Sequence, residues 1–432
     1  MIALTGLVPR PSEAFIAQLV GEEPAVMIEG PRGSGKSTLL RAIAAKFGGN
    51  VVDLDDAATL AEIRAGSDAP LTSNGLIAVD EFQRAPEVLS TVKRVVDRQG
   101  GVSRFLLAGS VSDRLLPKST ETLTGRVQRV TLLPLSAGEI LRQPTSWLTQ
   151  VLDGAGTVPN VRSDLRRDAV FDLVAAGGYP GALRRPTLTL QRRWLNSYLA
   201  MVADRDLPAL VDIRSSGTVA NLFRLASERS GQIVNLAELG QRLAIKPQTV
   251  RTYLTLLERC FLVDELPPWS VGVSARSGRR AKLHVIDTGL GASSIHADAR
   301  KLSRLAFGGS LVESFVVSEL RKQAAVIDEP LAFAHFRDHG GAEVDLIVER
   351  PDGTVVGIEV KASTLSGRSD AKGLRFLRDA LGDRFTCGVV MQTGPLTVQL
   401  DDRIWATPIP ALWGGGGIVP GATGLGSDTT EH

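Results

Sequence analysis

The stretch AVMIEGPRGSGKST, residues 25–38, leads from an apolar strand through a glycine-rich turn into a helical pattern. The turn fits G-x-x-x-x-G-K-[ST], in which glycines let successive backbone N–H groups point at phosphate oxygens while the following helix adds its dipole. We therefore predict an ATP-binding loop, in which Lys36 reaches the β- and γ-phosphates and the Ser37 hydroxyl holds Mg²⁺. The alternative is a glycine-rich turn beside a surface lysine. The residues of the predicted loop are Gly30, Pro31, Arg32, Gly33, Ser34, Gly35, Lys36, Ser37 and Thr38.

Short apolar runs separated by helix-length segments continue on both sides of this loop. Buried strands that alternate with helices predict a parallel α/β sheet, here the sheet of a P-loop NTPase. The runs are Ala25–Glu29, Val51–Leu54, Leu76–Val79, Phe105–Ala108 and Val127–Leu133.

Two acids follow one of these strands, in the run LIAVDE from Leu76 to Glu81. A nucleotide site needs a carboxylate to hold its magnesium shell, and we assign that role to Asp80. Glu81 would polarise the attacking water, which favours ATP hydrolysis over binding alone. The alternative is that Glu81 caps or solvates the next helix, whose start Pro86 marks.

The strand FLLAG ends in a hydroxyl side chain, Ser110. Strand carboxyl ends in such sheets face the ligand crevice, so Ser110 could orient the water or sense the γ-phosphate. An equally good interpretation is a serine that caps a helix.

The composition is that of a globular chain with no membrane-spanning segment. The 432 residues carry a net charge of +2, with 43% hydrophobic and 22% charged residues, and no apolar stretch approaches the length of a membrane helix. The N-terminus lacks the pattern of a secretory signal. Cys260 and Cys387 cannot form a disulfide framework, so we expect a reducing, cytoplasmic environment.

Composition shifts divide the chain into an ATPase domain over 1–150, a helical domain over 168–282 and an α+β domain over 283–413. A polar, Gly/Pro-bearing stretch over 153–167 is predicted to be a linker or mobile loop. The glycine-rich tail, residues 414–432, is predicted to be disordered.

The middle region contains a helix-turn-helix pattern. A short helix capped by Asn235 is followed by a turn and a second helix that starts at Pro247. Such a second helix can enter a DNA major groove, while a basic wing touches the phosphates. The alternative is a lid that packs on the ATPase domain and touches no DNA. The predicted DNA contacts are Gln248, Thr249, Arg251, Arg279 and Arg280.

Several motifs together resemble a prokaryotic branch of the AAA-type ATPases, whose C-terminal domain of unknown function resembles the PD-(D/E)XK nuclease fold. They are GPRGSGKS (30–37), LIAVDEFQR (76–84), FLLAGS (105–110), LTGRV (123–127), LLPLS (132–136), GGYPGAL (177–183), DRD (204–206), LHVIDTGL (283–290) and EVDLIVE (343–349). The resemblance implies a homo-oligomer in which an arginine from a neighbouring subunit completes the ATP site. Arg126 is the favoured candidate and Arg114 the other.

The same resemblance implies a second site in the last domain. Strand alternation places Glu359 and Lys361 on one face, and Asp345 lies on the preceding strand of a predicted hairpin. In the nuclease-like family, an Asp and a Glu hold Mg²⁺, a Lys assists, and the first helix supplies a further acid, here Glu313. The alternative is a hairpin with a solvated, charged face.

The sequence therefore predicts an Mg²⁺-dependent ATPase whose ATP cycle is coupled to DNA handling, with nuclease-type cleavage by the last domain as a further hypothesis. The expected cofactors are ATP and Mg²⁺; the expected partners are DNA and further copies of the chain, with no membrane. The rival hypothesis is a nucleotide-regulated interaction or assembly protein, which neither binds nor cuts nucleic acid. Its C-terminal nuclease-like fold would be non-catalytic.

Overall fold

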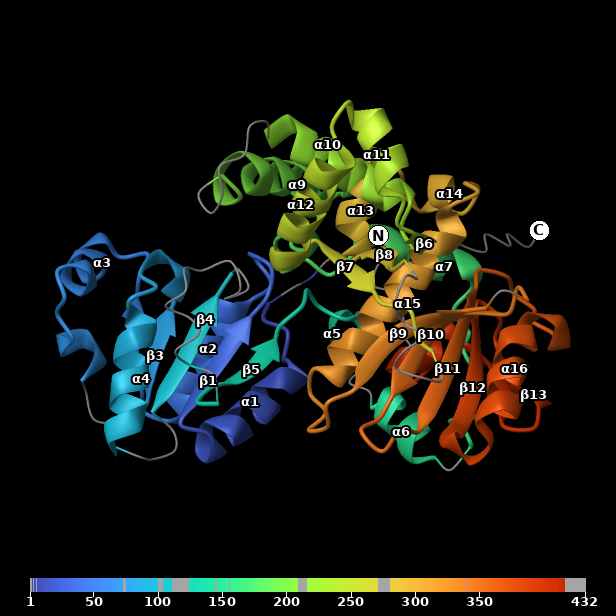
Figure 1. Cartoon of the computed structure of the whole chain (residues 1–432), viewed down its shortest axis with the longest axis horizontal. Helices are drawn as coiled ribbons and strands as arrows, with labels where there is room; N and C mark the ends of the chain where they lie inside the picture. The colour runs from blue at the N-terminus through green and yellow to red at the C-terminus, as the bar shows by residue number, and fades with distance from the viewer. Residues whose placement is uncertain are drawn as a thin grey trace, which may run out of the picture.

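The computed structural model describes residues 2, 4, 6–72, 75–99, 104–110, 123, 125–143, 146–154, 156–208, 216–270, 280–338 and 340–415. Its elements form an N-terminal body, a helical upper region and a C-terminal body (Figure 1). No helix within these ranges has the length and apolar character needed to cross a membrane. The predicted tail lies largely outside the described residues.

A five-stranded parallel sheet with the order β2-β3-β4-β1-β5 forms the N-terminal body. This confirms the predicted parallel P-loop NTPase sheet. Side chains of β1 alternate between two cores: Val26 and Ile28 pack with α1 and α2, whereas Ala25 and Met27 pack with α3 and α4. Helices cover both faces, which explains why the three central strands β3, β4 and β1 are buried along their whole length, whereas the edge strands β2 and β5 are not. The elements are α1 (Pro11–Glu22), β1 (Ala25–Glu29), α2 (Lys36–Lys46), β2 (Asn50–Asp53), α3 (Ala57–Arg64), β3 (Ile77–Asp80), α4 (Val88–Gln99), β4 (Phe105–Gly109) and β5 (Gln128–Thr131).

The upper region is helical, with a small antiparallel sheet of order β6-β8-β7. Strand β8 and helices α13 and α14 belong to this region, because α13 and α14 pack on α7. The third unit was predicted to begin at residue 283, which falls inside β8 and before α13 and α14. The elements are α7 (Arg167–Ala176), α8 (Pro180–Leu183), α9 (Leu188–Met201), the π-helix η5 (Val202–Asp206), α10 (Ser216–Glu228), β6 (Gln232–Ile233), α11 (Leu236–Leu243), α12 (Pro247–Arg259), β7 (Val263–Leu266), β8 (Lys282–Val285), α13 (Thr288–Ser294) and α14 (Ala299–Leu302).

The C-terminal body is a six-stranded mixed sheet of order β13-β14-β12-β11-β10-β9. Helix α15 packs on one face and α16 on the other, so apolar side chains of β10 and β11 enter two separate cores. The predicted hairpin is present as the antiparallel pair β10 and β11. The elements are α15 (Gly308–Ala324), β9 (Ala332–Arg337), β10 (Glu343–Glu349), β11 (Val355–Lys361), α16 (Lys372–Leu381), β12 (Phe385–Gln392), β13 (Val398–Asp401), β14 (Ile404–Pro408) and η9 (Ile409–Trp413).

The segment predicted as a linker or mobile loop lies instead along the C-terminal body. Ser163 N–H donates to Pro395 O at 2.8 Å, and Trp405 Nε1 donates to Gly156 O at 3.1 Å. Just before it, α6 (Trp147–Asp153) packs on α15, with Leu148 N–H donating to Gln323 Oε1. The chain therefore crosses to the C-terminal body before it enters the helical region.

Candidate functional site

The glycine-rich loop between β1 and α2 has the backbone shape that its sequence predicts. Gly30, Gly33 and Gly35 have φ angles of 155°, 77° and 105°, which favour glycine. At Gly30 a Cβ atom would lie 2.2 Å from the backbone oxygen of Leu132. Lys36 Nζ donates to the carbonyl oxygens of Gly30 and Pro31, both at 2.9 Å, so it lies inside the loop.

The loop contains one buried polar group that no described residue satisfies. Ser34 is fully buried, and its hydroxyl oxygen makes no hydrogen bond within the described part of the chain. A buried polar atom without a partner is costly, so this position suits a polar ligand.

The acid at the end of β3 contacts the loop directly. Ser37 Oγ donates to Asp80 Oδ1 at 3.1 Å, and Arg41 Nη2 lies 3.4 Å from Asp80 Oδ2. Burial raises the pKa of Asp80, while the hydrogen bond from Ser37 opposes that rise. A hydroxyl and a carboxylate side by side are oxygen ligands of the kind that Mg²⁺ takes.

Glu81 and Ser110 meet beside this pair, as their places at neighbouring strand ends predict. Ser110 Oγ donates to Glu81 Oε2 at 3.2 Å, and Glu81 itself has a φ of 56°. Gln83, which sequence reasoning missed, donates to both side chains: to Ser110 Oγ at 2.9 Å and to Glu81 Oε2. Gln83 lies on η2 (Phe82–Arg84), and the sequence offered one signal for it, its position two residues after Glu81.

A cavity of about 560 Å³ opens above the loop, and its other walls come from distant parts of the chain. The N-terminal segment 6–10 forms one wall, and Pro180, Gly181, Arg184 and Trp194 of the helical region form another. Trp194 lies against the loop, since a Cβ at Gly33 would be 3.8 Å from its Cη2. Sequence reasoning missed these wall residues.

Two arginines join the loop to its surroundings. Arg10 donates to Ser34 O at 3.1 Å, to Leu133 O at 2.9 Å and to Glu139 Oε1 at 2.6 Å. Arg32 pairs with Asp206 of η5 at 3.2 Å. The loop is therefore connected to the helical region by an ion pair as well as by Trp194.

Arg126 does not join this site. Its Nε lies 2.5 Å from Asp97 Oδ1 at the end of α4. Strand β5 starts at Gln128, opposite Val26, whereas the loop follows the other end of β1. Arg126 thus lies near the end of the sheet that is opposite to the loop, so it does not reach the loop of its own chain. Arg114 lies outside the described residues.

The predicted DNA-contacting helices α11 and α12 are present and joined by a short turn. Gln248 is exposed and Thr249 half-buried at the start of α12. Arg251 forms an ion pair with Glu265 of β7, and Arg280 is exposed just before β8. A groove of about 700 Å³ runs between these elements. Arg279 lies outside the described residues.

The four polar residues predicted in the last domain converge on one cavity of about 410 Å³. Lys361 Nζ lies 2.7 Å from Glu359 Oε1, and Val360 N–H donates to Asp345 Oδ2 at 3.0 Å. Glu313, on α15, faces them across the cavity.

A lysine that sequence reasoning missed occupies the centre of this acid cluster. Lys282 of β8 places its Nζ 3.0 Å from Glu313 Oε1, 3.1 Å from Glu343 Oε1 and 2.8 Å from Asp345 Oδ1. Among the residues that the structure describes, no three His, Cys, Asp or Glu side chains are arranged to hold a metal ion. The only sequence signal was a lysine at the start of a strand.

Burial controls the protonation of this cluster. It would lower the pKa of Lys282, but the carboxylates of Asp345 and Glu313 outweigh it and raise that pKa. Burial raises the pKa of Glu313 well above its ordinary value, and it raises the pKa of Glu359 to about 8. Lys282 therefore stays charged, while the raised pKa values of Glu313 and Glu359 mean that these two carboxyls hold protons more tightly than exposed ones.

We expect ATP affinity to fall as pH rises above about 8. Burial lowers the pKa of Lys36 to about 8, although the negative charges of Glu81 and Asp80 act to raise it. Bound phosphates would raise that pKa again, so binding takes up a proton above pH 8 and not below it. The expected loss is roughly ten-fold per pH unit. Calorimetric titration on both sides of pH 8 measures it. An ATP affinity that does not change between pH values below and above 8 would contradict the assignment of Lys36 to phosphate binding. The Lys36→Arg variant should bind ATP more weakly than the wild type, with an affinity that does not change over the same pH range.

Comparison with known proteins finds three family models that match successive parts of the chain. Residues 22–141 match the family described as AAA domain. Residues 167–301 and 308–412 match two families that are each described as a domain of unknown function, DUF8612 and DUF4143. The N-terminal body, a parallel P-loop NTPase-like sheet, is thus the part of the chain that is similar to AAA domains.

Proteins similar to most of this chain occur in mycobacteria. The uncharacterized proteins Mb2031c of Mycobacterium bovis and Rv2008c of Mycobacterium tuberculosis are each 27% identical over 401 residues, which covers 92% of this chain and 83% of theirs. Among solved structures, the Walker-type ATPase PABY2304 of Pyrococcus abyssi has a TM-score of 0.43 at 16% identity and covers 67% of this chain and 96% of its own. The RuvB Holliday junction branch migration motor of Thermotoga maritima has a TM-score of 0.29 at 17% identity, covering 62% and 93%.

Proposed function

We propose that this chain binds ATP with Mg²⁺ and hydrolyses it. The observation that carries the proposal is the contact of Ser37 Oγ with Asp80 Oδ1 at 3.1 Å, at the mouth of a loop cavity large enough for a nucleotide. The match of residues 22–141 to an AAA domain supports the same activity.

Each residue of the site then has a role. The loop amides and Lys36 bind the phosphates, and Ser37 and Asp80 hold Mg²⁺, which neutralises phosphate charge when bound. Glu81 takes a proton from the attacking water, while Ser110 and Gln83 orient its carboxylate through their hydrogen bonds. Arg126 acts from a second copy of the chain in a homo-oligomer.

Trp194 offers a direct test, because its ring lines the cavity and touches the loop. Adding ATP with Mg²⁺ should change tryptophan fluorescence in the wild type and not in Trp194→Phe, and inorganic phosphate should then accumulate. The matched control is Trp405→Phe, which lies on β14 away from this cavity and should keep the signal. Binding without phosphate release would overturn the hydrolytic proposal, and no binding at millimolar ATP would overturn both parts.

We further propose that the ATP cycle is coupled to DNA handling through α11, α12 and the small sheet, acting as a winged helix. The start of α12 is solvent-facing at Gln248, and Arg280 is exposed at the entrance of β8. Arg251 would have to leave Glu265 to reach DNA. The ion pair of Arg32 with Asp206 offers a physical connection between this region and the ATP loop.

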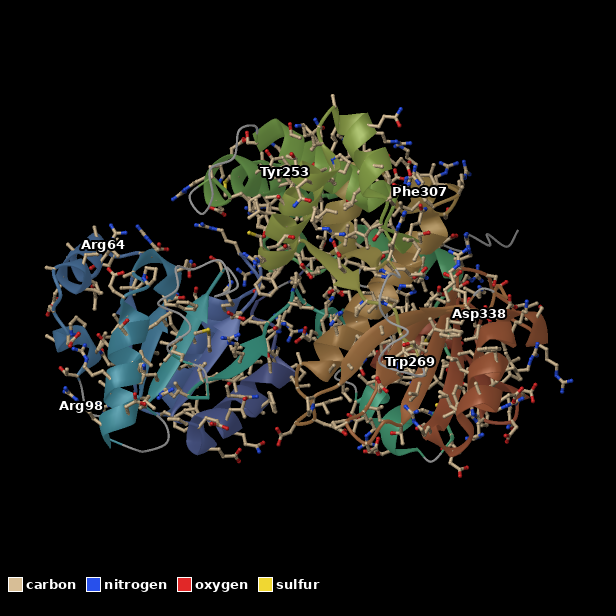
Figure 2. The ribbon with its side chains drawn as sticks, viewed as in Figure 1. Arg64, Arg98, Tyr253, Trp269, Phe307 and Asp338 are labelled. Atoms are coloured by element: carbon tan, nitrogen blue, oxygen red, sulfur yellow. The ribbon has the colours of Figure 1, made fainter. Side chains whose placement is uncertain are left out.

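DNA association should weaken log-linearly as salt rises, because neutralised phosphates release counterions. Arg280→Ala should reduce that slope by about 1. Arg98→Ala is the matched control, since Arg98 is exposed on the N-terminal body, far from Tyr253 of α12 (Figure 2). Fluorescence anisotropy with duplex and single-stranded DNA measures both. No association at low salt would favour the rival function, a nucleotide-regulated assembly protein.

Metal-dependent phosphodiester cleavage by the C-terminal body is a second candidate, favoured by the convergence of Glu313, Asp345, Glu359 and Lys361 on one cavity. Cleavage should disappear in Asp345→Ala and in Lys361→Ala. Cutting that survives both substitutions would remove this candidate. The rival, a non-catalytic nuclease-like fold, predicts no cutting by the wild type.

A further inference from the structure

The acid cluster of the C-terminal body contains its own cation. An ammonium group has three N–H donors, and Lys282 Nζ lies within 3.1 Å of one carboxylate oxygen from each of Glu313, Glu343 and Asp345. The Lys282 side chain is 3% exposed, so these contacts are shielded from solvent. Two of these contacts, with Glu313 and Asp345, are hydrogen bonds, and the third, with Glu343, is an ion pair.

Lys282 comes from a different sheet from the acids that it contacts. It lies on β8, the central strand of the small sheet, where it pairs with Ile233 of β6 and Leu266 of β7. The acids lie on α15 and β10. The position of the ammonium is thus set by how the helical region packs on the C-terminal body.

The cluster nevertheless keeps capacity for more positive charge. Four carboxyl groups, those of Glu313, Glu343, Asp345 and Glu359, face three cationic groups: the ammonium groups of Lys282 and Lys361 and the guanidinium of Arg337, which lies 4.0 Å from Glu343. Glu359 is 8% exposed, and its Oε2 atom has no hydrogen-bond partner among the described residues. Glu359 also lines the cavity beside the cluster. An unpartnered, buried carboxylate oxygen beside other acids is a hard ligand of the type that Mg²⁺ and Mn²⁺ prefer.

We propose that Lys282 is an internal cation that closes this site, so that its ammonium and a divalent metal ion compete for the carboxylates of Glu313 and Asp345. While Lys282 is in place, the cluster holds the helical region on the C-terminal body and excludes metal, so metal-dependent cleavage at this cavity requires that Lys282 first withdraw. When Lys282 is removed or withdrawn, the same carboxylates together with Glu359 become a Mg²⁺ or Mn²⁺ site. The inference is independent of ATP hydrolysis, and its readout is metal binding, so a chain without nuclease activity can still satisfy it.

Mn²⁺ binding to the nucleotide-free, full-length chain tests this proposal, with free Mn²⁺ measured by electron paramagnetic resonance. Lys282→Met should bind at least ten-fold more tightly than the wild type, and Lys282→Met/Asp345→Asn should lose the gain. Because the Ser37 and Asp80 site is the same in all three chains, it contributes equally to each. The matched control is Lys372→Met, an exposed lysine on α16, which should bind as the wild type does.

Removing a buried ammonium from among carboxylates also threatens folding, so thermal melting is the second measurement. Mn²⁺ should raise the melting temperature of Lys282→Met more than that of the wild type. The proposal is overturned if Lys282→Met gains neither binding nor metal stabilisation, or if the gain persists in the double variant. It is equally overturned if the wild type already binds Mn²⁺ as tightly as Lys282→Met does and if this binding depends on Asp345.

Discussion

Replacing Glu81 with Gln is expected to lower ATP turnover by about 10²–10⁴-fold while ATP still binds. The amide keeps the size of the side chain and its hydrogen bond from Ser110, which lies 3.2 Å from Glu81 Oε2, but it cannot accept a proton from water. Steady-state phosphate release measures the turnover, and Trp194 fluorescence measures the binding. Turnover that stays at the wild-type level would show that another group activates the water.

Gln83 supplies a graded companion to that experiment. Gln83→Leu removes the donor to both Glu81 and Ser110 but leaves the carboxylate itself in place. A positioning role predicts a smaller loss in kcat than Glu81→Gln causes, with KM for ATP little changed. The matched control is Gln18→Leu, because Gln18 is exposed on α1 and its amide donates to Glu22 of the same helix.

Gly178→Ala is expected to destabilise the chain by about 3 kcal/mol, the upper end of the cost of overpacking a core. A Cβ at Gly178 would lie 2.1 Å from the backbone oxygen of Leu135 and 2.9 Å from its nitrogen. These neighbours are backbone atoms, so no side-chain rotation can relieve the contact. The same glycine donates its N–H to Asp287 Oδ2 at 2.7 Å and accepts from Leu135 N–H at 2.9 Å.

Urea unfolding and soluble yield measure this loss of stability. Because Leu135 and Pro180 line the nucleotide cavity, ATP affinity should fall together with stability. The matched control is Gly217→Ala in α10, where a Cβ meets nothing within 4 Å and alanine is the better helix former. Equal stability of the two variants would mean that the strands and helices around Gly178 can move apart without cost.

The local parts of the nucleotide site could be predicted from the sequence because their chemistry and geometry are encoded over a few residues. A strand, a glycine turn and a helix in succession place Lys36 and Ser37. Asp80 lies near them at the carboxyl end of β3, a parallel strand separated from β1 by β4. The walls of the cavity could not be predicted in this way. Trp194 reaches the loop through the packing of a helical region that carries no nucleotide-binding motif.

The C-terminal body shows the same division. Strand alternation predicted that Glu359 and Lys361 share a face, and the structure brings Asp345 and Glu313 to the same cavity. The segment 153–167 was predicted to be a linker because it is polar and rich in turn residues. Its backbone nevertheless forms hydrogen bonds with the C-terminal body, such as the bond to Pro395 in the connection between β12 and β13. Composition describes a segment's own preferences and says nothing about distant partners.

The sequence by itself determined the phosphate loop, its acid partner and the parallel sheet that holds them, because short-range backbone geometry and strand burial dictate those features. Only the tertiary structure decided that Gln83 donates a hydrogen bond to Glu81, that Arg126 pairs with Asp97 away from its own loop and that Lys282 fills the acid cluster. The physical reason is that all three features depend on which side chains long-range packing brings within hydrogen-bond distance. An ammonium on one sheet can neutralise carboxylates on another only after both sheets have folded.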